Sequence, residues 1–289
     1  MSRSTLRDHA WLPRASCDAE CLRASCSDAP RRFVVGLRMT LRAILALLLA
    51  LALPLLAVPL PGRSAAKRTY CRLLLRSLGV RITVSGGPVR NLPGVLVVSD
   101  HMSWLDVVTI GAVLPRSGWR TQPLSFVARA DVADQFAVRM MARIIRAIPI
   151  DRASLRQLPG VVGIVAARLR AGHTVVAFPE GTTWCGLACG PFYPAMFQAA
   201  IDAGRPIQPL RLRYHHQDGN LSTVPAFVGD DTLLRSIRRL LASRRTLARV
   251  YVESLELPGT DRRELARRCQ AAVRTAAPGQ PLPGHVLAG

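Results

Sequence analysis

Residues 95–106 have the sequence VLVVSDHMSWLD, which joins an apolar run to the start of a helix. The apolar residues Val95–Val98 predict a short buried strand, and Ser103 followed by apolar residues indicates a helix start. His101 then falls in the turn between the two elements. Two residues five apart on one helix point about 140° away from each other, so His101 faces Asp106 only from such a turn.

The pair His101 and Asp106 has two interpretations. A carboxylate that accepts a hydrogen bond from one imidazole nitrogen fixes the tautomer and leaves the other nitrogen to take a proton, which is the logic of a catalytic dyad with His101 as general base. Alternatively, Ser103 and Asp106 form a capping box in which Asp replaces the usual Glu or Gln. The residues alone leave both interpretations open.

A second strand-end loop lies farther along the chain. The apolar residues 175–178 predict a buried strand, and the residues that follow, 179–183, are PEGTT. Pro ends a strand ladder, and Gly permits close backbone approach to a ligand. Backbone N–H groups with the hydroxyls of Thr182 and Thr183 fit a phosphate, and Glu180 fits an arginine or a substrate hydroxyl. Taken alone, this loop would be interpreted as an ordinary turn.

Strands and helices alternate through the rest of the chain. This order predicts an α/β fold with a mixed, largely parallel sheet flanked by helices, and the two loops then fall at strand ends, where such sheets bind ligands. The predicted strands are 80–85, 95–99, 124–128, 147–150, 174–178, 207–214 and 249–255. The predicted helices are 65–78, 104–113, 131–145, 154–171, 193–203, 231–246 and 261–276. The helix at 231–246 is both apolar and Arg-rich, so it fits a membrane-surface helix and a core-packed helix equally well.

Composition sets the class of partner. The chain has 289 residues and is 49% hydrophobic, which suffices for one sizeable core with appendages. Lys+Arg number 39 against 18 Asp+Glu, a formal net charge of +21, which favours an anionic surface as partner. The sequence has no zinc-finger spacing and no basic region followed by heptads, so we expect a membrane rather than a nucleic acid.

An uncharged segment near the N-terminus supports this expectation. Residues 43–60 carry no charge, and as a helix they would span about 27 Å against a hydrocarbon core near 30 Å. Pro54 and Pro59 would kink or end that helix, so a re-entrant or interfacial helix is an alternative to a full span. Basic residues lie on both sides of the segment and give no orientation. A cleaved secretory signal is a further alternative, and an uncleaved anchor is favoured.

The seven cysteines do not form a disulfide framework. Cys185 and Cys189 follow the second loop, but without matching His or Cys pairs we expect reduced thiols and no metal site. His215 and His216 beside Asp218 are likewise expected to belong to a solvated loop.

Together the motifs resemble the glycerolipid acyltransferases of the 1-acylglycerol-3-phosphate acyltransferase type, whose first block is His, four residues, Asp. The resemblance covers roughly residues 70–257, with four blocks in the family's order. These blocks are residues 101–106, residues 126–129 followed by 148–152, residues 178–182, and residues 205–210.

The resemblance implies roles for individual residues. His101 would be the base and Asp106 its orienting partner, Arg152 with Gly181 would bind the acceptor's phosphate or equivalent head group, and Glu180 would take part in acceptor binding. The predicted substrate-binding set is completed by Arg129, Thr182 and Thr183. Many family members have Arg where this chain has Thr183, which leaves room for a head group other than a simple phosphate.

The implied activity is transfer of a fatty acyl group from acyl-CoA or acyl carrier protein to a lysolipid hydroxyl in phospholipid biosynthesis. The first expected acceptor is 1-acylglycerol-3-phosphate, giving phosphatidate, and lyso-ornithine lipid or another lysophospholipid is the alternative. A hydrolase is another alternative, but the sequence contains no Gly-x-Ser-x-Gly nucleophile elbow. A non-catalytic basic membrane-binding protein is a further alternative. No cofactor is expected beyond the donor as co-substrate, and the oligomeric state is not predicted.

These expectations divide the chain into four parts. Residues 1–40 are expected to be a disordered basic tail, 41–62 a membrane anchor helix, 63–277 the acyltransferase domain, and 278–289 a flexible tail. The anchor would be single-pass or monotopic, with membrane lipids as partners. We expect the catalytic domain on the cytoplasmic side, because the thioester donors are cytosolic.

Overall fold

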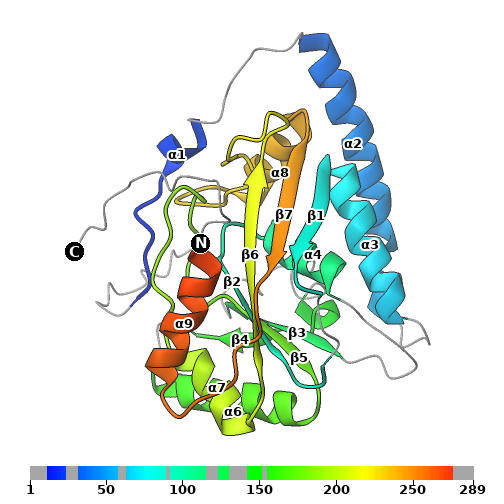
Figure 1. Cartoon of the computed structure of the whole chain (residues 1–289). Coiled ribbons are helices and arrows are strands. Elements are labelled where there is room, and N and C mark those ends of the chain that lie inside the picture. The colour runs from blue at the N-terminus through cyan, green and yellow to red at the C-terminus, as the bar shows by residue number, and fades with distance from the viewer. Residues whose placement is uncertain are drawn as a thin grey trace.

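A single sheet forms the centre of the molecule (Figure 1). The computed structural model describes residues 12–23, 32–57, 63–88, 92–114, 123–129, 142–151 and 155–275. Its seven strands lie in the order β1-β7-β6-β2-β5-β3-β4. They are β1 (Val80–Gly86), β2 (Leu96–Ser99), β3 (Leu124–Arg129), β4 (Ile148–Ile150), β5 (Thr174–Ala177), β6 (Ile207–His215) and β7 (Thr246–Val252).

Neighbouring strands are parallel throughout the sheet except for β6 and β7, which pair antiparallel. The predicted mixed, largely parallel sheet is therefore confirmed. All seven predicted strands are present, because short runs of Val, Leu and Ile between polar turns are typical of strands buried on both faces.

Helices cover both faces of the sheet. The described helices after the N-terminal region are α3 (Arg63–Ser77), α4 (Leu105–Val113), α6 (Leu158–Arg170), α7 (Ala195–Ala203), α8 (Leu233–Ala242) and α9 (Arg262–Arg274), with a 3-10 turn η3 (Leu155–Gln157) before α6. Side chains alternate along β2: Leu96 and Val98 pack with α6, α7 and α9, whereas Val95 and Val97 pack with Ile110 of α4. Each face of the central strand thus has its own core.

Local signals explain some of the helix ends. Pro159 lies at the start of α6, where its missing N–H costs nothing, and α7 ends at Gly204 with a left-handed φ of 61°. The predicted helix 231–246 is too long, since α8 ends at Ala242 and β7 begins at Thr246. From Thr246 onward buried and half-buried residues alternate, as is typical of a strand. The strand therefore begins three residues before its predicted start at residue 249.

The N-terminal region differs from the expectation. The helix α2 (Arg32–Ala52) begins well before the predicted anchor at 41 and continues into the 3-10 turn η1 (Leu53–Ala57), so its α-helical part ends two residues before Pro54. One stretch of the described residues, Phe33–Leu56, is long and apolar enough to cross a membrane, and none of its apolar window is buried. Figure 1 shows α2 beside α3 at the edge of the molecule.

Residues 12–23, which fall within the tail expected to be disordered, lie against the rest of the protein. Cys17 is 7% exposed there, and a short helix α1 (Ala19–Arg23) follows it. Their anchoring contacts are with residues far along the chain, which no local pattern reveals. Most of the predicted helix 131–145 and the predicted tail 278–289 lie outside the described residues.

Candidate active site

The two motif loops meet because β2 and β5 are adjacent parallel strands. The carboxyl ends of parallel neighbours lie at the same edge of a sheet, so the turn after Ser99 and the loop after Ala177 emerge side by side. The His101 ring stacks on the Phe178 ring, with centroids 4.0 Å apart and an interplanar angle of 15°.

His101 and Asp106 form the predicted contact. His101 lies in the turn between β2 and α4, and its Nδ1 is 3.0 Å from Asp106 Oδ2. The His101 side chain is 16% exposed, whereas Asp106 is fully buried. When Nδ1–H donates to Asp106, Nε2 carries a lone pair. Within the described residues no hydrogen-bond partner occupies Nε2, so this nitrogen is available to a substrate.

Asp106 also holds the turn, as the capping interpretation requires. Its Oδ2 accepts hydrogen bonds from the backbone N–H groups of Met102 at 2.7 Å and Ser103 at 2.8 Å. The helix begins at Leu105, whose N–H donates to Ser103 Oγ at 3.2 Å. This is part of a capping box shifted by one position, so one carboxylate both orients the imidazole and closes the helix start.

Tyr214 is a site residue that the sequence analysis does not identify. From β6, next to β2, its hydroxyl donates to Asp106 Oδ1 at 2.8 Å. Burial raises the Tyr214 pKa well above its ordinary value, and the Asp106 charge raises it further. The phenol therefore keeps its proton and remains a donor to Asp106. The alternation along β6 predicts a buried side chain at this position, but it does not predict the partner.

Glu180 ties the two loops together instead of facing open space. It is 1% exposed, its Oε2 accepts from His101 N–H at 2.8 Å, and its Oε1 accepts from Gly190 N–H at 3.0 Å. Burial raises the Glu180 pKa to about 8, with a further contribution from the Asp100 charge. Both carboxyl oxygens are engaged with backbone groups, which places Glu180 as a positioning residue for the His101 turn.

A buried charge pair lies beneath the turn. Arg213 of β6 donates to Asp100 Oδ2, next to His101. Burial raises the Asp100 pKa, and the Arg213 charge offsets part of that rise. Burial alone would lower the Arg213 pKa, but Asp100 raises it overall. Neither residue was predicted as part of the site, because the pair joins β6 to the turn after β2, far away in the sequence.

The remaining loop residues fall into different settings. Gly181 has φ of +68°, and a side chain there would meet Pro13 of the N-terminal segment at 2.7 Å. Thr182 is half-buried, and its hydroxyl has no hydrogen bond within the described part of the chain. Thr183 instead donates its hydroxyl to the Phe227 carbonyl. Both hydroxyls were expected to contact a head group, whereas only that of Thr182 is free to donate.

Two predicted arginines cannot be placed at the site. Arg129 ends β3, and its side chain lies outside the described residues, as does the whole of Arg152. Their proposed substrate contacts therefore stay predictions.

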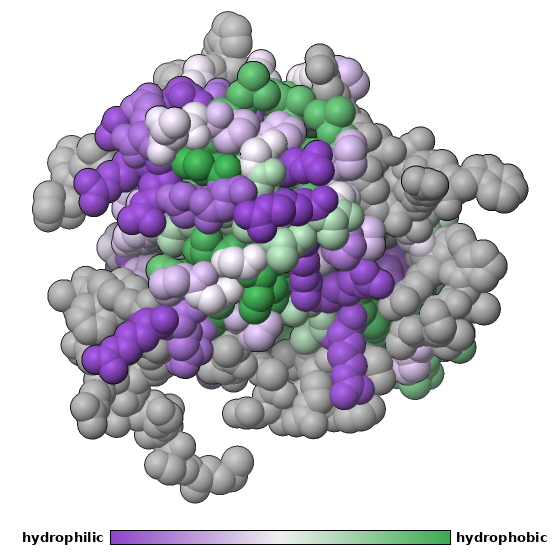
Figure 2. Space-filling view, turned by 90° about the horizontal axis from the view of Figure 1, so that it is seen from below, coloured by the Kyte–Doolittle hydropathy of each residue, from purple (hydrophilic) through white to green (hydrophobic). Residues whose placement is uncertain are grey.

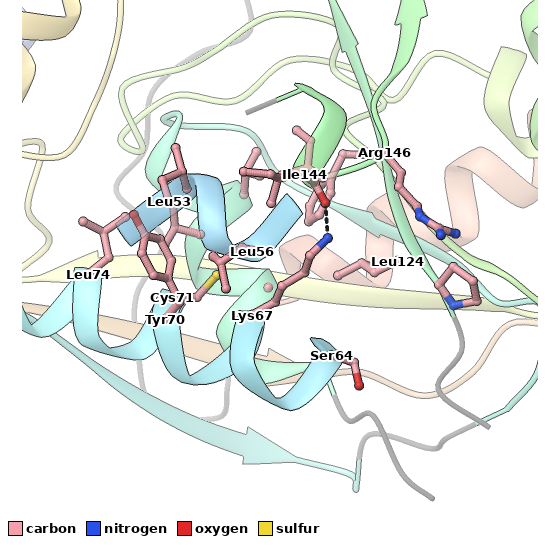
Figure 3. A pocket seen from close by; sticks show the side chains of 16 residues that line it. Leu53, Leu56, Ser64, Lys67, Tyr70, Cys71, Leu74, Leu124, Ile144 and Arg146 are labelled. Carbon is pink, nitrogen blue, oxygen red and sulfur yellow. Dashed lines mark hydrogen bonds between the residues drawn. The ribbon is translucent and has the colours of Figure 1, made fainter. Parts of the chain in front are cut away.

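An apolar pocket runs beside α4 (Figure 3). Val107 and Val108, which follow Asp106 directly, line one side of it. Lys67 donates to the Ile144 carbonyl at its rim. Further lining residues come from η1, α3 and β3, among them Leu53, Leu56, Leu74, Leu124 and Phe126.

Comparison with known proteins gives a consistent result. A family model described as Acyltransferase matches residues 81–213. A lyso-ornithine lipid O-acyltransferase of Pseudomonas aeruginosa is 32% identical over 231 residues, 76% of this chain and 83% of that protein. A 1-acyl-sn-glycerol-3-phosphate acyltransferase of Neisseria meningitidis serogroup B is 32% identical over 190 residues, 65% of this chain and 71% of that protein.

The fold has a counterpart among solved structures. The crystal structure of the 1-acyl-sn-glycerophosphate acyltransferase PlsC from Thermotoga maritima superposes with a TM-score of 0.60, covering 85% of this chain and 96% of that one. Identity between the two is 15%, so this likeness concerns the fold alone.

Proposed function

The chain belongs to the acyltransferase family, and from that premise we propose that it moves a fatty acyl group from acyl-CoA or acyl carrier protein to a lysolipid hydroxyl with His101 as the base. The observation that carries this proposal is the Nδ1 to Oδ2 contact of 3.0 Å between His101 and Asp106, which leaves Nε2 unoccupied within the described residues. A general base must reach the proton that it removes, and Nε2 is the atom placed to do so.

The proposed reaction is a direct transfer. Nε2 of His101 takes the proton of the lysolipid hydroxyl as its oxygen attacks the thioester carbonyl. The new C–O bond forms, the C–S bond breaks, and the departing thiolate receives the proton from the imidazolium. Asp106 stabilises the transient imidazolium, and Tyr214 and the backbone N–H groups keep the carboxylate in place.

The pocket beside α4 suits the acyl chain. Most of its lining is aliphatic or aromatic, and two of the lining residues, Val107 and Val108, directly follow Asp106 in the sequence. We expect Val108→Phe to narrow it and to shift the product toward shorter acyl groups, as read by mass spectrometry of the lipid product. The same change at Ile164, which is 49% exposed on α6, is the matched control and should leave chain length unchanged. An unchanged acyl profile in Val108→Phe would contradict this assignment.

Between the candidate acceptors, the site favours lyso-ornithine lipid over 1-acylglycerol-3-phosphate. The Thr183 position carries no cation, and its hydroxyl already donates to the Phe227 carbonyl. A phosphate would therefore lack at this loop the cationic donor that Arg provides in many family members. The Pseudomonas relative, whose name states lyso-ornithine lipid, also matches more of this chain than the Neisseria relative does.

One assay tests both parts of the proposal. The purified protein is incubated with acyl-CoA or acyl carrier protein and each lysolipid, and products are identified by mass spectrometry. We expect esterified product, preferentially from lyso-ornithine lipid, and a loss of about 10³-fold or more in His101→Ala. Faster turnover of 1-acylglycerol-3-phosphate would reverse the acceptor assignment. Release of free fatty acid alone would indicate hydrolysis. Full activity of His101→Ala would show that His101 is not the base.

The exposed apolar face of α2 supports residence at a membrane. We propose a monotopic placement on the cytoplasmic face, because one side of α2 is held by the catalytic domain. Arg38 donates to the Ala242 carbonyl of α8 at 2.6 Å, and Tyr70 of α3 donates to the Leu49 carbonyl at 3.0 Å. A helix crossing the hydrocarbon core would carry these polar contacts into it.

A further inference from the structure

The N-terminal segment 12–23 crosses the loop that follows Glu180. In Figure 1 it is the dark blue trace and helix that run beside the green loop. Pro13 packs against Gly181, and the Thr223 hydroxyl donates to the Cys21 carbonyl at 2.7 Å. The segment therefore borders the candidate acceptor site without belonging to the sheet.

Three cysteine thiols converge where this segment meets the loop. The Sγ atoms of Cys17, Cys21 and Cys185 all lie within 4.8 Å of one another. Cys17 and Cys185 are buried, and Cys21 is half-buried. Cys17 and Cys185 are 168 residues apart, so only the folded chain brings the set together. This is why the spacing of the cysteines along the sequence predicts no site.

The sulfur atoms are placed as hydrogen-bond acceptors. Cys17 Sγ accepts from the Cys185 backbone N–H at 3.3 Å. Cys185 Sγ accepts from the Cys17 thiol and from the backbone N–H groups of Ala188 and Leu187. N–H donors directed at sulfur stabilise a thiolate, which is the form that binds metals.

We propose that Cys17, Cys21 and Cys185 bind one Zn²⁺ ion that fastens the N-terminal segment to the loop after Glu180. Each thiol gives up its proton to solvent and forms one S–Zn bond, and a water molecule completes the tetrahedron. With Zn–S bonds of about 2.3 Å, the sulfur atoms of such a site are about 3.8 Å apart, within the spread of this cluster.

A disulfide accounts for the cluster less well than an ion does. It would join two of the sulfurs at about 2.05 Å and leave the third thiol beside it without a role. An ion engages all three, and soft thiolate ligands without carboxylates select Zn²⁺ over Mg²⁺ or Ca²⁺. The proposal is independent of acyl transfer, because it concerns how the segment is held.

Metal content of the full chain tests the site directly. The protein is purified without chelator and analysed by plasma mass spectrometry, and we expect one zinc per chain. Cys21→Ser should reduce the content to background, whereas Cys189→Ser, an exposed cysteine on the same loop, should leave it unchanged. Replacement of zinc by Co²⁺ should give a thiolate-to-cobalt charge-transfer band in the near ultraviolet that Cys21→Ser lacks.

A second measurement distinguishes loss of the zinc ion from misfolding of the variant. Trypsin cleavage after Arg14, which is exposed in the segment, should accelerate when a chelator is added to the wild type, while Cys21→Ser should be cleaved fast with or without chelator. The proposal is overturned if the zinc-reconstituted wild type holds no stoichiometric ion or Cys21→Ser retains it. It is also overturned if alkylation and mass spectrometry find a Cys17–Cys185 disulfide in the native protein.

Discussion

At the scale of single residues, the proposed chemistry depends on Asp106 performing two tasks. Its Oδ2 contacts the imidazole and two backbone N–H groups, and its Oδ1 accepts from Tyr214. A buried carboxylate with this many donors keeps a fixed position without a separate cation beside it. The same residue therefore links local helix formation to the orientation of the base.

Asp106→Asn separates charge from geometry. The amide keeps an oxygen toward His101 and the turn, and its NH₂ group can donate to Tyr214, so we expect a folded protein. The loss of charge removes stabilisation of the imidazolium, and we expect turnover to fall about 10³-fold. Steady-state rates with thermal unfolding measure both effects. Near-normal turnover with a stability loss of about 1 kcal/mol would leave Asp106 only its capping role.

Glu180→Gln should change how stability depends on pH. The Glu180 pKa is raised from 4.5 to about 8, so the folded state binds this proton more tightly than the unfolded state. Its contribution to the free energy of unfolding is complete below about pH 4.5 and is lost as pH rises through about 8. Gln does not titrate.

The Tm of the wild type relative to that of Glu180→Gln should accordingly fall from about pH 5 to about pH 8. The Asp100 pKa is also raised, and its titration contributes to the pH dependence of both proteins. Parallel pH curves for the two proteins would contradict the assignment.

At the scale of elements, the sequence predicts what depends on local pattern. Apolar runs locate the strands, and the strand-to-helix turn places His101 opposite Asp106. Arg213 and Tyr214 were missed because their partners, Asp100 in the turn after β2 and Asp106 in α4, lie far from them in the sequence. Glu180 was predicted as a site residue, but its contacts with His101 and Gly190 follow from the packing of two loops that no periodicity records. Contacts between distant segments are set by topology, which a single sequence constrains only through strand order.

The junction of α2 and α8 is such a contact. Arg42 donates to the carbonyls of Leu241 at 3.1 Å, Ser243 at 2.6 Å and Arg244 at 2.7 Å, where α8 leaves its carbonyls without helical partners. Its guanidinium lies where a side chain at Gly79 would be, so Gly79 makes room for it.

Arg42→Met should detach α2 from α8. Charged hydrogen bonds to these carbonyls are lost, and we expect the free energy of unfolding to fall by about 2 kcal/mol. Chemical unfolding in detergent micelles provides the measurement. Arg235→Met, an exposed arginine on α8, is the control and should change stability little. Equal stability of the two variants would show that α2 docks by other contacts.

At the scale of the whole molecule, apolar and basic surfaces are distributed unevenly. The end of the molecule in Figure 2 shows hydrophilic side chains with smaller hydrophobic patches between them. The outer side of α2, by contrast, exposes large apolar residues along its length, including Phe33, Leu41, Leu47 and Leu51. On the neighbouring α3, Arg72 and Arg76 are exposed. An apolar stripe flanked by arginines is typical of a helix lying in the interface of an anionic membrane.

This placement predicts how binding responds to mutation. Leu47 is 62% exposed and Leu48 is 57% exposed, and each leucine contributes about 1.5–3 kcal/mol when its side chain enters apolar surroundings. The double variant Leu47→Glu with Leu48→Glu should bind anionic vesicles at least roughly 100-fold more weakly in a flotation assay. Ile164→Glu, on α6, is the control and should float like the wild type. If the double variant floats as well as the wild type, α2 does not form the membrane contact.

The contacts of α2 with the catalytic domain also predict the membrane topology. If α2 lies in one leaflet, an epitope fused before Met1 and the catalytic domain are on the same side of the bilayer. In sealed inverted vesicles, which expose the cytoplasmic face, added protease should then remove the epitope and digest the domain together. A spanning α2 would instead protect the epitope until detergent is added. Because Arg38, Arg42 and Tyr70 hold one side of α2 to the domain, we expect the unprotected result.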